Sequence, residues 1–173
     1  MEVIDNFLSE EDFIEVEKLL MGANFAWHFN NLVVYGDDEE SVPKEDNFQF
    51  THAFYTPDIE AGYEAVNSQH FPVLFPILKK LPIKALWRVK SNMMPKQDKH
   101  IVHEYHKDVP SKDFKSTTAI FYVNTNNGYT IFKDGTKVDS VANRLVSFDS
   151  QKLHSGSTCT DTKSRVVINI NYF

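Results

Sequence analysis

The sequence has few cysteines, no long apolar run and no recognisable signal peptide, and each of these absences limits the kind of protein it can be. It contains a single cysteine, Cys159, so no disulfide can form within the chain, as is typical of proteins from a reducing compartment. No apolar run approaches the roughly 20 residues that a membrane-spanning helix needs. The first five residues lack the basic segment and following apolar run of a signal peptide. We therefore expect a soluble, cytoplasmic protein without a membrane partner.

The chain also lacks a surplus of basic residues and any glycine-rich phosphate loop. Its 24 acidic residues outnumber the 18 lysines and arginines, and the formal net charge is −6. Because non-specific nucleic-acid binding depends on lysine and arginine contacts to phosphate, this balance counts against a nucleic-acid partner. The acidic run at residues 36–41 lacks the spacing of a calcium loop, so we expect a solvated surface loop there.

What remains is an ordinary apolar fraction, 42%, with 14 phenylalanines in 173 residues. This is enough to build one domain, for which we predict a support region at residues 1–83 and a core barrel at residues 84–173. In the support region the spacing of apolar residues predicts a helix over residues 13–20, with Ser9 as its N-cap and Gly22 as its stop. Residues 61–69 and 73–81 are predicted helices, and residues 47–55 a predicted strand that ends at a turn at Pro57 and Asp58.

From residue 84 onwards the sequence consists of short apolar, β-branched segments separated by turn residues. The predicted strands are residues 84–93, 101–106, 115–124, 129–132, 137–138, 144–148, 152–155 and 165–172. Asp134-Gly135 is a hairpin signal between two of them. About eight short strands at this spacing predict a double-sheet jelly roll.

The segment His-Glu-Tyr-His-Lys-Asp at residues 103–108 contains the most chemically suggestive residues. On a strand, His106 and Asp108 would point to the same face, and His154 could join them from far along the chain. Two imidazoles and one carboxylate form the facial set that holds non-haem Fe(II) and leaves open positions. The alternatives are zinc, or a surface His–Asp pair with His154 in a turn. His103 is odd-spaced from His106 and is expected to point away.

Arg165 begins an apolar stretch that continues as Val-Val-Ile. An arginine at the start of a core strand requires an anion, since an unpaired buried charge is costly. The anion could be a ligand carboxylate, or else Asp149 or Asp161 at the rim of the barrel.

Taken in order, the His-x-Asp motif, the distal His154 and Arg165 eleven residues later resemble the 2-oxoglutarate/Fe(II) dioxygenases, in particular their compact prolyl 4-hydroxylase-like branch. The resemblance covers about residues 84–173. Residues 128–132, Gly-Tyr-Thr-Ile-Phe, are similar to the family's Gly-Gly-x-Thr-x-Phe strand, residues 142–148 are similar to the strand before the distal histidine, and residues 154–156 match the turn of that histidine. The resemblance implies a mainly β protein with N-terminal helices, built on a double-stranded β-helix (jelly roll, cupin-like).

The resemblance also implies roles for individual residues. His106, Asp108 and His154 would hold Fe(II). Arg165 would bind the distal carboxylate of 2-oxoglutarate, with the hydroxyl of Tyr122 or Thr130 beside it. Relatives often carry a cosubstrate-contacting tyrosine on the strand before His-x-Asp, where this chain has Ser-Asn-Met-Met at residues 91–94; we expect Asn92 to contact the cosubstrate instead, and one of the two methionines to supply an apolar wall.

The implied activity is hydroxylation of a C–H bond with O₂ and 2-oxoglutarate, releasing succinate and CO₂, with ascorbate as a stimulant. The expected substrate is a residue of a protein or peptide, such as proline, approached by loops at residues 36–47 and 109–114. Two alternatives stay open: oxidative demethylation of nucleic acid, and a non-catalytic metal-binding jelly-roll module.

Overall fold

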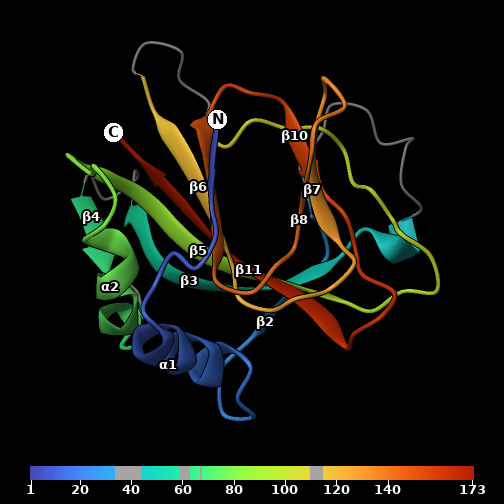
Figure 1. Ribbon diagram of the computed structural model, residues 1–173, viewed down its shortest axis with the longest axis horizontal. Coiled ribbons are helices and arrows are strands. Elements are labelled where there is room, and N and C mark those ends of the chain that lie inside the picture. Colours follow the sequence, from blue (N-terminus) through green and yellow to red (C-terminus); the bar gives the residue numbers. More distant parts are fainter. Residues whose placement is uncertain (34–43, 59–62, 67, 110–114) are drawn as a thin grey trace.

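The computed structural model describes residues 1–33, 44–58, 63–66, 68–109 and 115–173, which form two antiparallel sheets (Figure 1). The larger sheet contains β1 (Glu2–Ile4), β2 (His28–Asn30), β3 (Gln49–Asp58), β4 (Tyr63–Val66), β5 (Leu86–Pro95), β6 (Thr117–Tyr122), β9 (Arg144–Asp149) and β11 (Ser164–Tyr172). Its order is β1-β9-β6-β11-β5-β3-β2, with β4 added beside β3. The smaller sheet has the order β10-β7-β8, from β7 (Tyr129–Phe132), β8 (Lys137–Asp139) and β10 (His154–Gly156).

Strand β11, in the middle of the larger sheet, divides the interior into two parts. Val166, Ile168 and Ile170 belong to the core cluster that also contains residues of the N-terminal helix. Val167, on the opposite face, belongs to a second cluster with residues of β7 and β8 in the smaller sheet. Because successive side chains of a strand alternate between faces, Arg165 and Asn169 share the face of Val167 and look towards the space between the sheets.

The helices cover the face of the larger sheet that points away from the smaller one (Figure 1). They are α1 (Glu10–Leu20), the 3₁₀ turn η2 (Phe71–Leu74) and the single-turn α2 (Phe75–Leu78). A further 3₁₀ turn, η1 (Lys44–Asp46), lies apart from them (Figure 1). The predicted N-cap of α1 is confirmed, because the Ser9 hydroxyl accepts a hydrogen bond from the Asp12 amide at 3.3 Å. Gly22 follows the helix so closely that a Cβ there would lie 2.6 Å from the Lys18 carbonyl oxygen, which explains a glycine at this stop.

The N-terminal region contributes to the barrel directly as well as supporting it. β1 pairs with β9, and β3 pairs with β5. Asn143, at a left-handed φ of 61°, accepts a hydrogen bond from the Leu8 amide and donates one to the Leu8 carbonyl. None of the helices in the described part of the chain has the length and apolar character that crossing a bilayer requires.

Several local predictions are wrong. The predicted helix at residues 61–69 contains a strand, β4, because the edge of β3 offers it a partner. The predicted helix at residues 73–81 is two short pieces, since Pro76 has no N–H with which to continue η2 into α2. β3 continues through the predicted turn to Asp58, and residues 101–106 form no strand, only isolated bridges at Val102 and His106.

The other predicted strands of the second half appear within a few residues of their predicted limits, and the hairpin glycine, Gly135, has the positive φ of 87° that its turn requires. The mainly β architecture with helices in the N-terminal half is therefore confirmed. The acidic run at residues 36–41, with much of both predicted substrate loops, lies outside the described residues.

Candidate metal centre

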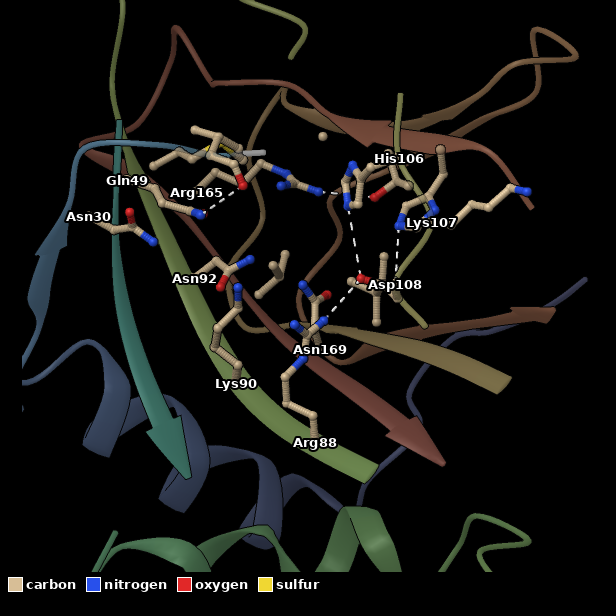
Figure 2. A pocket seen from close by; sticks show the side chains of 17 residues that line it. Asn30, Gln49, Arg88, Lys90, Asn92, His106, Lys107, Asp108, Arg165 and Asn169 are labelled. Carbon is tan, nitrogen blue, oxygen red and sulfur yellow. Dashed lines mark hydrogen bonds and ion pairs between the residues drawn. The ribbon is translucent and has the colours of Figure 1, made fainter. Parts of the chain in front are cut away.

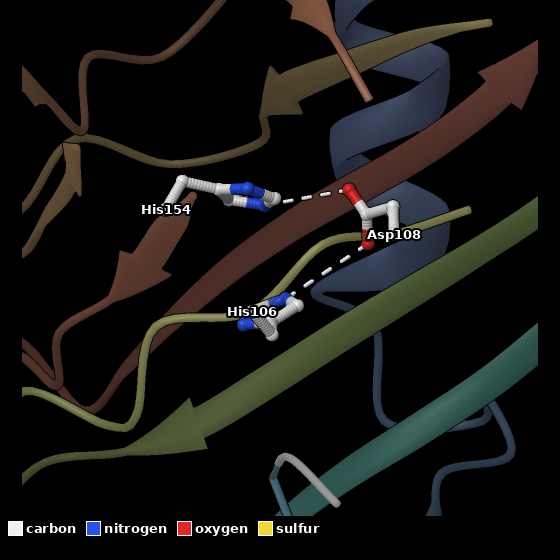
Figure 3. Close-up of side chains that lie close together, drawn as sticks. All are labelled: His106, Asp108 and His154. Atoms are coloured by element: carbon white, nitrogen blue, oxygen red, sulfur yellow. Dashed lines mark ion pairs between the residues drawn. The ribbon is translucent and has the colours of Figure 1, made fainter. Parts of the chain in front are cut away.

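His106, Asp108 and His154 come together between the two sheets (Figure 3). One ligand atom from each lies within 4.8 Å of the others. The Asp108 Oδ2 atom is 3.3 Å from His154 Nε2, and Oδ1 is 3.9 Å from His106 Nε2. Within the described residues this is the only such group of histidine, cysteine and carboxylate side chains. The structure thus assembles the three residues proposed from the sequence, although His106 and Asp108 do not lie on a regular strand.

Main-chain hydrogen bonds hold the two histidines side by side. The His106 amide donates to the His154 carbonyl at 2.9 Å, and the His154 amide donates to the His106 carbonyl at 3.2 Å. The Nδ1 atom of His106 lies 3.3 Å from the Glu104 carbonyl oxygen, and that of His154 lies 3.0 Å from the Lys152 carbonyl oxygen. These carbonyls favour the tautomers that carry the proton on Nδ1, which leaves the Nε2 lone pairs for a metal.

The carboxylate of Asp108 is fixed by two side chains from the larger sheet. Arg88 Nη2 donates to Oδ1 at 3.2 Å, and the Thr118 hydroxyl donates to Oδ2 at 2.9 Å. Asn171 closes the network, since its amide donates to the Thr118 hydroxyl and accepts from Arg88 Nε. The Asp108 side chain is therefore both buried and oriented before any metal binds.

The electrostatics of the cluster suit a divalent cation. Burial alone would raise the pKa of Asp108, but the hydrogen bond and charge of His154, with the charges of His106 and Arg88, hold the pKa well below its ordinary range. Burial, followed by the charge of His154, lowers the pKa of His106. An ionised carboxylate beside a neutral imidazole is the protonation state in which these residues bind metal.

Arg165 lies at the start of β11 with 2% of its surface exposed. Its Nε donates to the Ser140 hydroxyl at 2.8 Å and its Nη2 to the Thr130 hydroxyl at 3.1 Å; the Tyr122 hydroxyl donates to the same Thr130 oxygen at 2.8 Å. All of these partners are neutral. In the part of the chain that the structure describes, no carboxylate pairs with this guanidinium, so neither aspartate considered as a rim partner is in use.

Two glycines make room for this arginine. A Cβ at Gly128 would lie 2.7 Å from Arg165 Cδ. One at Gly156 would lie 3.2 Å from Arg165 Nη1 and 3.3 Å from Met94 Cε. Gly128 and Gly156 are the glycines of the two motifs that flank the site in the sequence, so the close approach of Arg165 explains why those motifs contain glycine.

A cavity of about 280 Å³ joins the metal cluster to Arg165 (Figure 2). Of the residues expected to contact a cosubstrate, Asn92, Thr130 and Arg165 line it, as does Met94. Tyr122 does not line it, but its hydroxyl donates a hydrogen bond to Thr130 and its ring centroid lies 5.7 Å from Arg165 Cζ. Met93 packs on the helix side of the sheet, which leaves Met94 as the apolar wall.

Further polar residues of the cavity were missed by the sequence reasoning. They are Asn30, Gln49 and Lys107, with Arg88 and Lys90 on β5 and Asn169 on β11. A usable signal was present, because Arg88, Lys90 and Asn92 on β5, and Asn169 and Asn171 on β11, alternate with largely apolar residues. His103 is 3% exposed, outside the metal cluster, and its ring nitrogens have no hydrogen-bond partner among the described residues; burial lowers its pKa to about 4.

No family model and no curated protein sequence matches this chain. Solved structures do match. A prolyl hydroxylase from Trichoplax adhaerens, in complex with a hypoxia-inducible-factor oxygen degradation domain peptide fragment, is similar over 99% of this chain and 82% of its own, with a TM-score of 0.64 and 16% identity. An oxidoreductase of the 2OG-Fe(II) oxygenase family from Burkholderia pseudomallei is similar over 95% and 80%, with a TM-score of 0.64 and 11% identity.

The chain has the fold of the 2-oxoglutarate/Fe(II) oxygenases. The predicted double-stranded β-helix is thereby confirmed. The oxygenase fold also includes the α-ketoglutarate-dependent epimerase SnoN of nogalamycin biosynthesis, which is similar over 98% of this chain and 74% of its own, with a TM-score of 0.62 and 14% identity. Since a hydroxylase and an epimerase share this oxygenase fold, the reaction of this chain has to be argued from its own side chains.

Proposed function

We propose that this protein is an Fe(II)- and 2-oxoglutarate-dependent oxygenase that hydroxylates a C–H bond of its substrate. One atom of O₂ would enter the hydroxyl group and the other would enter succinate as 2-oxoglutarate loses CO₂. The observation that carries the proposal is the pairing of two sites in one cavity: a two-histidine, one-carboxylate cluster, and a buried arginine without a carboxylate partner among the described residues.

The residues present fit Fe(II). His106 and His154 direct their Nε2 atoms to a common point, and Asp108 supplies an ionised oxygen there. This donor set occupies one face of an octahedron, which leaves positions for a chelating cosubstrate and for O₂. Bound there, iron would supply the one-electron and oxygen chemistry that no protein side chain can perform. Zinc fits the same ligands but cannot perform that chemistry.

Arg165 fits the distal carboxylate of 2-oxoglutarate. Its guanidinium is charged and buried, and its present hydrogen-bond partners are neutral hydroxyls. A carboxylate could accept two parallel hydrogen bonds from it and balance its charge. The Thr130 hydroxyl lies next to it and also lines the cavity, while Met94 and Val167 provide apolar surface between the two ends. In this proposal the protein orients the cosubstrate, keeps Asp108 ionised and limits the access of water.

The substrate we propose is a residue of a protein or peptide, and the resemblance to prolyl hydroxylases makes proline the first residue to test. The similar Trichoplax protein is itself a prolyl hydroxylase in complex with a peptide fragment, which supports a peptide over a nucleic acid. The formal charge of −6 supports the same choice.

The test is turnover of 2-oxoglutarate without a known substrate. Purified protein would receive Fe(II), ascorbate and 2-oxoglutarate, and succinate would be followed with and without peptide and nucleic-acid libraries. We expect slow succinate release alone and faster release with peptides; omitting ascorbate shows whether it stimulates. His154→Ala and zinc-loaded protein are the controls and should release none. If the Fe(II)-loaded protein also releases none, the non-catalytic binding module becomes the better hypothesis.

A further inference from the structure

The floor of the cavity is a ladder of paired residues on β5 and β11 (Figure 2). The facing pairs along it are Arg88 with Asn171, Lys90 with Asn169, Asn92 with Val167, and Met94 with Arg165. The intervening residues, such as Val89 and Ile168, belong to the core under the helices. The ladder therefore places Arg165 and Met94 at one end, and a polar, cationic group of side chains at the other.

Lys90 is the charged residue of this ladder for which the described part of the chain supplies no partner. Its side chain lines the cavity, and among the described residues it makes neither an ion pair nor a hydrogen bond. The neighbouring Arg88 is already engaged with Asp108 and Asn171. Burial, followed by the charge of Arg88, lowers the pKa of Lys90 to about 8, so the ammonium still predominates at neutral pH.

Two amide oxygens near Lys90 also lack partners among the described residues: that of Asn169, which faces Lys90 on β11, and that of Asn92, two residues further along β5. Asn92 Oδ1 and Asn169 Oδ1 are buried, and neither has a hydrogen-bond partner in the described part of the structure. Both side chains line the cavity. A buried acceptor without a donor destabilises the protein, because it has lost its hydrogen bonds to water and gained none in return. A molecule with N–H or O–H groups at this place would satisfy both oxygens at once.

The net charge of the cavity wall is positive, which favours a negatively charged ligand. Its described residues include four cations, Arg88, Lys90, Lys107 and Arg165, against one carboxylate, Asp108. The difference is 4 − 1 = +3. Fe(II) raises it by 2 and the 2-oxoglutarate dianion lowers it by 2, so the same excess faces the substrate. A proline ring offers this surface neither charge nor a donor, whereas a carboxylate would be attracted to it.

We propose that the substrate presents a carboxylate to Lys90, and hydrogen-bond donors of the same molecule to the amide oxygens of Asn92 and Asn169. This inference rests on the proposed function and narrows it, and it assigns Asn92 to the substrate in place of the cosubstrate contact expected from the sequence. The hydroxylated group would be an acidic amino acid, or a residue directly beside one. The carboxylate could belong to a peptide or to a free amino acid, and these two sources are separated below.

The experiment uses two pools of otherwise identical random peptides, one with a central aspartate or glutamate and one with the matching asparagine or glutamine. Free aspartate and glutamate, with their amides, form a second pair of samples. Each is added to Fe(II)-loaded protein with 2-oxoglutarate and succinate is measured. Anaerobic calorimetry of the same complex measures binding without turnover. The variants are Lys90→Met, which keeps the bulk, and Lys90→Arg, which keeps the charge.

We expect the acidic samples to bind and to stimulate more strongly than their amides. Lys90→Met should bind the acidic samples about 10- to 150-fold more weakly than the wild type does, as expected when a charged hydrogen bond is removed. This variant should bind the acidic samples and their amides equally well. Lys90→Arg should recover part of the preference. Lys133→Met, which removes an exposed lysine outside the cavity, should behave as the wild type. Stimulation by free amino acids identifies a small-molecule source, and stimulation by peptides alone identifies a polypeptide.

Equal response to acids and amides in the wild type would overturn the inference. So would a Lys90→Met variant whose main defect is in 2-oxoglutarate binding, because Lys90 would then belong to the cosubstrate site. Absence of succinate from the wild type is a different result. It would remove the proposed function, while calorimetry with the acid and amide samples would still decide whether Lys90 binds a carboxylate.

Discussion

Replacing Arg165 with methionine should have opposite effects on the empty protein and on the protein with 2-oxoglutarate. In the empty protein the substitution removes a buried cation that has only neutral partners, Ser140 and Thr130. The two hydrogen bonds from this charged group contribute about 1.5–3 kcal/mol each, and the several kcal/mol that the burial of an unpaired ion costs offset them. We therefore expect the melting temperature of the empty variant to be unchanged or higher than that of the wild type.

With 2-oxoglutarate the same substitution should be severely damaging. Loss of one partner of a buried, hydrogen-bonded charge pair costs about 2–5 kcal/mol, or roughly 30- to 5000-fold in affinity. A ligand present at 100 times its dissociation constant stabilises a protein by about 2.7 kcal/mol, which corresponds to about 5–10 °C for a chain of this size. At the same concentration of 2-oxoglutarate, the variant should lose most of this increase in melting temperature.

The assay is thermal unfolding of metal-loaded wild type, Arg165→Met and Arg165→Lys, each with and without 2-oxoglutarate, supported by calorimetric titration. The lysine variant keeps the charge but loses the planar fork, so it should retain part of the response. A methionine variant that melts many degrees lower when empty, yet keeps its full response to 2-oxoglutarate, would show that Arg165 is a structural residue and that the cosubstrate assignment is wrong.

Three further predictions concern the metal cluster and its neighbours. His154→Ala should lose bound Fe(II), while His103→Leu should keep it, as measured by metal analysis after gel filtration; iron retained at full stoichiometry in the first variant would refute the ligand assignment. Arg88→Met should weaken metal binding by about 10- to 100-fold because Asp108 is no longer oriented, with partial recovery in Arg88→Lys; an unchanged metal titration would show that Thr118 suffices. As pH falls from about 6.5 to about 4, metal-free wild type should lose roughly 3 kcal/mol that His103→Leu does not lose, because only the unfolded chain protonates this histidine; parallel urea-unfolding profiles would contradict this.

The three proposed metal ligands and Arg165 could be singled out from the sequence because their chemistry is unusual for their surroundings. The arginine at the start of an apolar strand indicates a bound anion. The His-x-Asp motif amid predicted strands indicates a metal ion. The reasoning that placed His106 and Asp108 on one strand face was nevertheless wrong. The segment makes only isolated bridges, and Asp108 is positioned by Arg88 and Thr118 from elsewhere in the fold.

Other features depended on contacts that the local sequence does not contain. The segment at residues 63–66 is a strand because the edge of β3 is available to it, an effect of tertiary structure that local periodicity cannot report. Lys90 and Asn169 face each other across β5 and β11, but the register that pairs them joins residues almost 80 positions apart. The sequence shows only the alternation of polar and apolar residues within each strand. This alternation indicates that one face of the strand is polar, but not which strand lies beside it.

The paired main chains of His106 and His154 have a practical consequence. Two amide–carbonyl hydrogen bonds keep these ligands adjacent, and the ion is not needed for their alignment. In a small zinc domain the metal supplies the folding energy, so chelators unfold it. Here a chelator should empty the centre and leave the barrel intact. The centre could then be refilled under anaerobic conditions with Co(II) or Mn(II), which would give a stable complex whose spectrum reports on ligand binding without consuming cosubstrate.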